Sequence, residues 1–255
     1  MENKSFCIRM IPTLVSLLAV ALGVTAIKCA FEGNFEAAAF LIVLAAILDN
    51  FDGRIARALG VASDFGVQID SLADAVNFGV SPAFVVYLWK MSESDHVFFG
   101  WLPVLLLVFA LIIRLARFNS DLSLDDPESP LIKYFFKGMP APSVALMTLF
   151  PLIASFEFGD GFWTNPASVI INTIIMALFA VSKIPTPCLK KLHFTGTTNF
   201  VYKNTLRLLI LLILIGFIPQ IPFTPWFGLT ITGLVYLVGI VISIIAFNKI
   251  QNKYA

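Results

Sequence analysis

Four aspartates lie close together in an otherwise apolar part of the chain, and their side chains are well suited to chemistry. The stretch LDNFDGRIARALGVASDFGVQIDSLAD holds Asp49 and Asp52 three residues apart, and Asp70 and Asp74 four residues apart. Residues with these spacings share one face of a helix. The short link 58–65 makes the two helices antiparallel neighbours, so the four carboxylates are expected at similar depth.

Four crowded carboxylates repel one another, and the nearby Arg54 and Arg57 cannot neutralise all of them. Bound divalent metal is the economical explanation. Oxygen ligands without His or Cys favour Mg²⁺ or Mn²⁺ over Zn²⁺, and bridging carboxylates would hold two ions about 3.5–4 Å apart. The alternative is a set of ordinary interfacial acids, solvated or paired with arginine. Four acids on two facing helices with interleaved glycines weigh against that interpretation.

The elements that must position these acids are membrane helices. Of the 255 residues, 58% are hydrophobic and 13% charged, and mean hydropathy is +0.89. A soluble domain carries about a quarter charged residues, whereas apolar runs of about 20 residues cross a bilayer as helix. We therefore predict an all-α polytopic membrane protein that forms one catalytic domain over residues 1–255. Its eight predicted spans lie near 12–30, 35–56, 66–89, 98–117, 139–156, 166–183, 205–221 and 226–247, with Ser63 or Asp64 as the N-cap of the third.

The charges predict the orientation of these spans. Of the 17 Lys and Arg residues, only Lys28 and Lys90 fall in one set of connections, and the rest fall in the other set and the termini. By the positive-inside rule, both termini and the four aspartates face the cytoplasm. The predicted location is the inner (cytoplasmic) membrane.

The aspartates belong to a longer pattern. The sequence Asp49-x-x-Asp52-Gly53-x-x-Ala56-Arg57, eight residues, then Gly66-x-x-x-Asp70-x-x-x-Asp74 resembles the signature of the CDP-alcohol phosphotransferases at all eight fixed positions. The resemblance implies a six-helix core and leaves the last two predicted spans outside it.

It also implies roles for individual residues. Asp49 and Asp70 would bridge two metal ions, Asp52 would complete the first site, and Asp74 would complete the second and act as general base. The CDP group would contact two residues of the signature, one in the link between its halves and two near the N-terminus, namely Gly53, Arg57, Ser63, Thr13 and Ser16. The last two form Thr-x-x-Ser where the family often shows Asn-x-x-Thr, a conservative departure.

Further segments narrow the acceptor. Residues 71–83, 114–119, 137–143 and 181–187 resemble the membrane-embedded class of bacterial phosphatidylserine synthases. This resemblance implies CDP-diacylglycerol and L-serine as substrates, membrane lipids as surroundings and a homodimer, with no nucleic acid among the partners. Serine brings a carboxylate, so its pocket needs a cation, and the candidates on the correct side are Arg114, Arg117 and Lys137. Positive-inside anchoring is the alternative explanation for these three.

Other functions stay open at this stage. A sibling transferase would use glycerol phosphate, inositol phosphate or choline as acceptor. A divalent-cation transporter would use the acids to line an ion path, although they gather at one membrane face and Arg57 would oppose cation passage. A non-catalytic membrane assembly subunit would not need Asp74 in addition to the other three acids.

Overall fold

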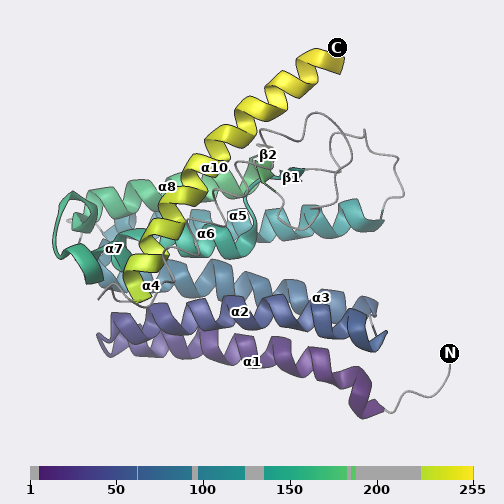
Figure 1. Cartoon of the computed structure of the whole chain (residues 1–255). Coiled ribbons are helices and arrows are strands. Elements are labelled where there is room, and N and C mark those ends of the chain that lie inside the picture. Colours follow the sequence, from purple (N-terminus) through teal and green to yellow (C-terminus); the bar gives the residue numbers. More distant parts are fainter. Residues whose placement is uncertain are drawn as a thin grey trace, which may run out of the picture.

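The computed structural model describes residues 6–61, 63–93, 97–123, 135–182, 185–187 and 225–254, and these residues are mostly helical (Figure 1). The long helices are α1 (Phe6–Phe31), α2 (Phe35–Leu59), α5 (Val97–Ser123), α8 (Pro166–Val181) and α10 (Pro225–Tyr254). Shorter helices are α3 (Asp64–Asp74), α4 (Ser81–Trp89), α6 (Ala141–Thr148) and α7 (Phe150–Phe158), with single turns at Met91–Glu93 and Phe162–Thr164.

Helices α1 and α2 form a closely packed antiparallel hairpin. The chain reverses at Gly33, whose φ of 78° is favourable only for glycine among common residues. Alanines are buried along the contact between the two helices, including Ala26, Ala30, Ala38 and Ala39. Small side chains let helix backbones approach closely inside a membrane, where the lipid offers no hydrophobic drive for association.

The third predicted span is one helical run with an irregular centre. Ser63 is the N-cap of α3, because its side chain accepts a hydrogen bond from Gly66 N at 3.1 Å, which confirms one of the two expected caps. A π-helical segment, η1 (Ala75–Val80), joins α3 to α4. Such segments are rare and occur frequently at functional sites.

The fifth predicted span is broken. Helices α6 and α7 meet at Leu149 with a bend of 43°. Pro151 lies in the first turn of α7 and lacks the backbone N–H that would continue the α6 hydrogen-bond pattern. A small antiparallel pair of strands, β1 (Phe135–Lys137) and β2 (Pro185–Pro187), brings the chain before α6 against the chain after α8.

The structure confirms an all-α membrane protein, with this strand pair as a minor addition. Within the part of the chain that the structure describes, three helices are long and apolar enough to span a bilayer, Met10–Phe31, Phe65–Trp89 and Phe98–Ser120, and the bent α6–α7 pair adds a fourth candidate. Helix α2 falls outside this group because it carries five charged residues. The predicted count of eight is therefore not confirmed, and the predicted span 205–221 lies outside the described residues.

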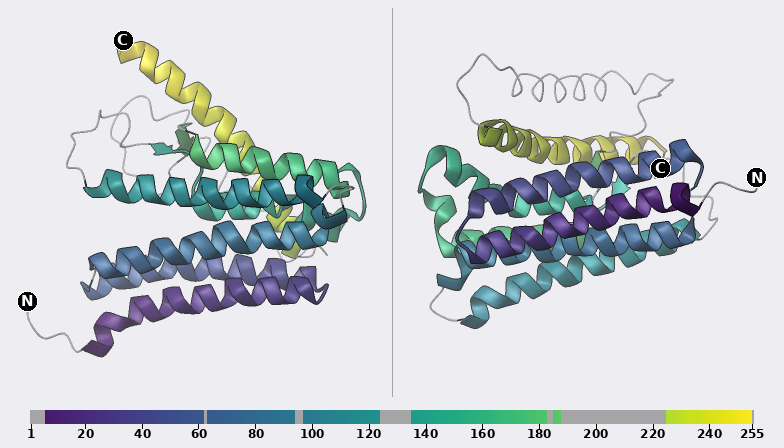
Figure 2. Two further views of the ribbon diagram at one scale, coloured as in Figure 1. Left: turned by 180° about the vertical axis from the view of Figure 1, so that it is seen from behind. Right: turned by 90° about the horizontal axis from the view of Figure 1, so that it is seen from below.

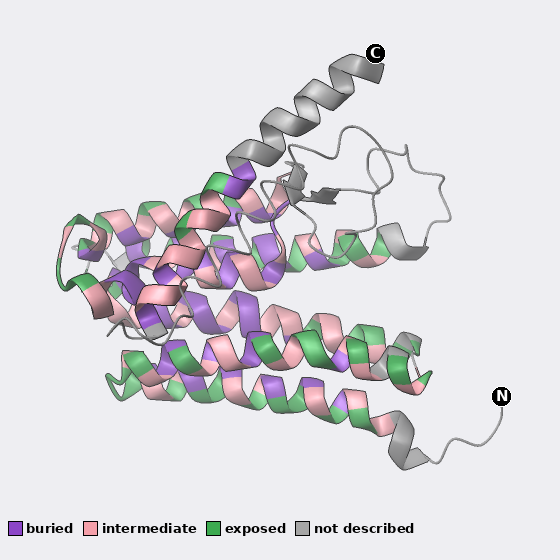
Figure 3. Ribbon diagram, viewed as in Figure 1, coloured by how far each residue is buried: buried purple, intermediate pink, exposed green. Residues whose placement is uncertain are grey.

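The buried core gathers where α4, α5, α6 and α7 meet (Figure 3). Phe78, Leu107, Leu111 and Leu149 are completely buried there. The outer faces of α1 and α5 instead present large apolar side chains, such as Leu18 and Phe109, which are 54% and 55% exposed. Apolar surface of this kind on a spanning helix is suited to lipid contact.

Candidate active site

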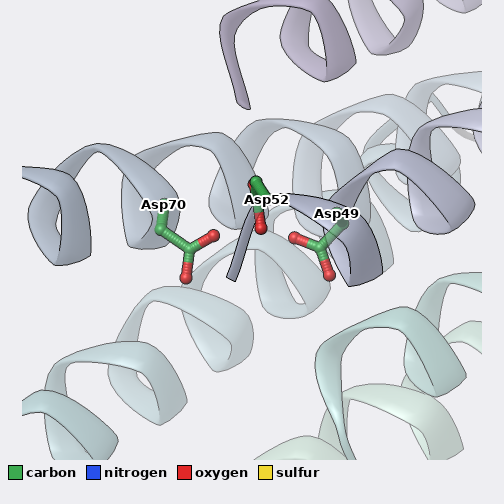
Figure 4. Close-up of side chains that lie close together, drawn as sticks. All are labelled: Asp49, Asp52 and Asp70. Atoms are coloured by element: carbon green, nitrogen blue, oxygen red, sulfur yellow. The ribbon is translucent and has the colours of Figure 1, made fainter. Parts of the chain in front are cut away.

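Three of the predicted metal ligands meet between α2 and α3. Asp49 and Asp52 lie on α2, Asp70 lies on α3, and one carboxylate oxygen from each lies within 4.8 Å of the other two. Figure 4 shows the three carboxylates directed toward a common space. This is the set that the family resemblance assigns to the first of two metal sites.

The carboxyl groups of the cluster form no ion pair with a cation in the described part of the chain. Asp52 is only 4% exposed, and Asp49 and Asp70 are half-buried. Neither the Lys28–Glu32 nor the Lys90–Glu93 ion pair involves these acids. Crowded carboxylates in partly buried positions are stable only with compensating charge. Oxygen-only donors at this separation fit a divalent cation such as Mg²⁺ or Mn²⁺.

Asp74 lies at the C-terminal end of α3, beside the cluster. Its carboxyl is close enough to Asp49, Asp70 and Arg114 to interact electrostatically with each of them. Its Oδ1 atom is buried without a hydrogen-bond partner among the described residues. Asp74 is not within the group of three, so the structure places it beside that group and toward α5.

Helix α1 contributes a polar contact on the side of Asp52. The Ser16 hydroxyl is buried and donates a hydrogen bond to Asp52 Oδ2 at 2.8 Å. Thr13 lies one turn earlier on α1 and is also buried, at 8% exposure. The conservative departure from the family pattern therefore retains two buried hydroxyl residues on α1, and one of them, Ser16, contacts the acidic cluster.

Three residues expected to contact CDP, Gly53, Arg57 and Ser63, lie near the end of α2 and at the start of α3. The backbone N–H of Gly53 donates to Asp52 Oδ1, which fixes that carboxylate from the α2 side. Ser63 is exposed and caps α3. Arg57 lies on the last turns of α2, and its side chain is outside the described part of the structure.

The three candidate acceptor ligands have different surroundings. Arg114 faces Asp74 from α5, and its Nε atom is buried without a hydrogen-bond partner among the described residues. Arg117 instead donates from Nη1 to the carbonyl oxygen of Val181 at 3.0 Å, near the end of α8. Lys137 lies in β1, and its side chain is outside the described part. Of the three, Arg114 is the one that the structure brings to the acidic cluster.

Two contacts near the site were not expected from the sequence. Ser71 and Asn119 hydrogen-bond to each other, with Asn119 Nδ2 donating to Ser71 Oγ at 3.0 Å, and this pair ties α3 to α5 next to Asp70. Tyr236 of α10 approaches Arg114. Asn119 lies in the segment 114–119 that resembles phosphatidylserine synthases, so the sequence offered a signal for its role. The position of Tyr236 depends on how α10 packs.

The chain was compared with known proteins. A sequence model of the CDP-alcohol phosphatidyltransferase family matches residues 9–186. A CDP-diacylglycerol–serine O-phosphatidyltransferase from Mycobacterium leprae is 40% identical over 193 residues, which is 75% of this chain and 62% of the relative.

Proteins of the same name from other bacteria are also similar to this chain, and the aligned share of each protein differs. The one from Helicobacter pylori strain J99 is 32% identical over 248 residues, 96% of each chain. The one from Bacillus subtilis is 32% identical over 181 residues, 71% of this chain and 92% of the relative. The chain thus spans less than two thirds of the mycobacterial relatives and nearly all of the Helicobacter one.

Proposed function

This chain belongs to the CDP-alcohol phosphatidyltransferase family, and on that premise we propose that it transfers the phosphatidyl group of CDP-diacylglycerol to L-serine. The products are phosphatidylserine and CMP. The observation that carries the proposal is the carboxylate cluster between α2 and α3, which combines the family signature with convergent oxygen ligands. The names of the relatives from three bacterial genera support serine as the acceptor.

The aspartates of the cluster would hold two metal ions. Asp49, Asp52 and Asp70 would hold one divalent ion, and Asp74 with the bridging Asp49 and Asp70 would hold a second. Bound Mg²⁺ or Mn²⁺ would neutralise the diphosphate of the donor and stabilise the departing CMP. Ser16 and the Gly53 N–H orient Asp52 by hydrogen bonds to its two oxygens.

Asp74 is assigned the role of general base. Its buried Oδ1 atom has no hydrogen-bond partner among the described residues and so is available to a substrate hydroxyl. In the transfer, the serine oxygen forms a bond to the β-phosphorus of the donor while the bond from that phosphorus to CMP breaks. The serine proton passes to Asp74, and CMP leaves with the bonding electrons.

The donor and the acceptor would approach from opposite sides of the cluster. We place CDP on the side of Asp52, because the predicted CDP contacts lie along α1, α2 and the start of α3, namely Thr13, Ser16, Gly53, Arg57 and Ser63. We place serine on the side of Asp74, because Asp74 lies close to Arg114 of α5. The charge pattern supports a cytoplasmic-facing site in the inner membrane, and the family supports a homodimer embedded among membrane lipids.

An acceptor screen tests the proposal. Purified protein with CDP-diacylglycerol and Mg²⁺ or Mn²⁺ is supplied in parallel with serine, glycerol phosphate, inositol phosphate or choline, and CMP release is measured. We expect serine-dependent release that clearly exceeds that with the other three. Stronger release with another acceptor would identify a sibling transferase, and no release with any would remove the assignment as an enzyme of this class.

A further inference from the structure

Buried polar atoms without hydrogen-bond partners occur, among the described residues, on Asp74, Asn77, Arg114 and Tyr236. Asn77 lies against Gly23 of α1, whereas the other three lie near one another beside α5. Buried donors and acceptors are almost always hydrogen-bonded, so a group of unpaired ones calls for an explanation. Asp74, Arg114 and Tyr236 come from three different helices, and the guanidinium of Arg114 interacts electrostatically with both of the other side chains.

Helix α10 is held in place so that Tyr236 points inward. Trp226 Nε1 donates to Glu36 Oε1 of α2 at 2.8 Å, which anchors the start of α10. At Gly233 a Cβ atom would lie 2.9 Å from a ring carbon of Phe150, so this turn of α10 sits tightly on α7. Tyr236 is three residues later and therefore on the same face. Figures 1 and 2 show α10 crossing obliquely over the other helices.

The unpaired groups match one end of an amino acid. Arg114 offers a guanidinium and Tyr236 a phenolic hydroxyl, both donors suited to a carboxylate. Ser143 of α6 lies close enough to the Tyr236 hydroxyl to exchange a hydrogen bond with it, so the two hydroxyls line the same space. Asp74, which also interacts with Arg114, offers a carboxyl oxygen that can accept a hydrogen bond. An acceptor with a carboxylate toward Arg114 and Tyr236 would direct its hydroxyl toward Asp74.

We propose that Tyr236 binds the carboxylate of the acceptor amino acid together with Arg114. This inference rests on the proposed function and deepens it, since it names a specificity residue for the same site. Tyr236 lies beyond residues 9–186, which the family model matches, so α10 supplies a substrate contact from outside the shared core. The helix thereby has a function in acceptor choice in addition to packing.

The test is Tyr236→Phe, which removes the hydroxyl and keeps the ring. Loss of one hydrogen bond to a charged group predicts a rise in KM for serine of about 10- to 100-fold. The KM for CDP-diacylglycerol should change less than about twofold, because the donor side of the cluster is untouched. The matched control is Tyr87→Phe. Tyr87 lies on α4, about 20 Å along the helical run from Asp74, and its ring packs edge-on against Trp101 with a centroid distance of 5.3 Å.

A second variant and a melting measurement separate binding from folding. Tyr236→Met fills similar space without a hydroxyl and should show the same selective rise in serine KM. An unchanged serine KM in both variants would overturn the inference, and so would equal increases in the KM of both substrates together with a lowered melting temperature. These outcomes differ from failure of the proposed function, which would appear as wild-type protein without serine-dependent CMP release.

Discussion

Substitution of Ser16 by alanine tests the contact between α1 and the acidic cluster. The Ser16 hydroxyl donates to Asp52 Oδ2 at 2.8 Å, and both side chains are only 4% exposed, so water cannot easily replace the lost donor. A hydrogen bond to a charged group contributes about 1.5–3 kcal/mol, which corresponds to roughly 10- to 100-fold in an equilibrium constant. Because Asp52 is a proposed metal ligand, we expect the metal concentration for half-maximal activity to rise by about tenfold or more.

The assay is CMP release by purified protein with saturating CDP-diacylglycerol and serine, titrated separately with Mg²⁺ and Mn²⁺. Turnover at saturating metal should stay within about threefold of wild type, because Asp52 itself is intact. Ser16→Thr keeps a hydroxyl and should behave like wild type. Thr25→Ala is the matched control, since its hydroxyl bonds to the Ala21 carbonyl oxygen on the exposed face of the same helix. Equal metal requirements for Ser16→Ala and Thr25→Ala would refute the reasoning.

Three further expectations follow from the site. Excess chelator should abolish CMP release, and full turnover in chelator would contradict the metal role. Asp49→Asn should lower turnover far more than Ser63→Ala, which removes one helix cap of about 1 kcal/mol. Asp74→Asn should retain donor binding, measured with labelled CDP-diacylglycerol, and lose about 10²–10⁴-fold in turnover; near-normal turnover would exclude it as the base. Single cysteines labelled with a membrane-impermeant reagent should report in, out, in, out and in at Ser63, Ser94, Asp125, Asp160 and Asn199, respectively. Any other order would reject the eight-span topology.

The sequence was sufficient for the features that depend on local spacing. The intervals between Asp49, Asp52 and Asp70 predicted two facing helices with convergent carboxylates, and the structure shows this geometry. Ser63 before an apolar run predicted the start of α3 correctly. Both predictions rest on helix periodicity and capping, which a few neighbouring residues determine.

Features that depend on contacts between distant segments were not predicted. The π-helical segment Ala75–Val80 lies inside a run that hydropathy alone counts as one regular span. The pairing of β1 with β2 joins residues about 50 positions apart. The approach of Tyr236 to Arg114 requires α10 to pack against the rest of the bundle, which no local pattern specifies.

The central claim is that the carboxylates between α2 and α3 carry out transfer to serine, and one measurement tests it directly. Wild-type protein, Asp49→Asn and the control Asp160→Asn are each given labelled serine, CDP-diacylglycerol and Mn²⁺, and labelled lipid and CMP are quantified together. Asp160 is exposed in the connection before α8, away from the cluster. We predict equimolar labelled lipid and CMP from wild type and Asp160→Asn, and a loss of both products in Asp49→Asn. Equal formation of labelled lipid by all three proteins would contradict the claim.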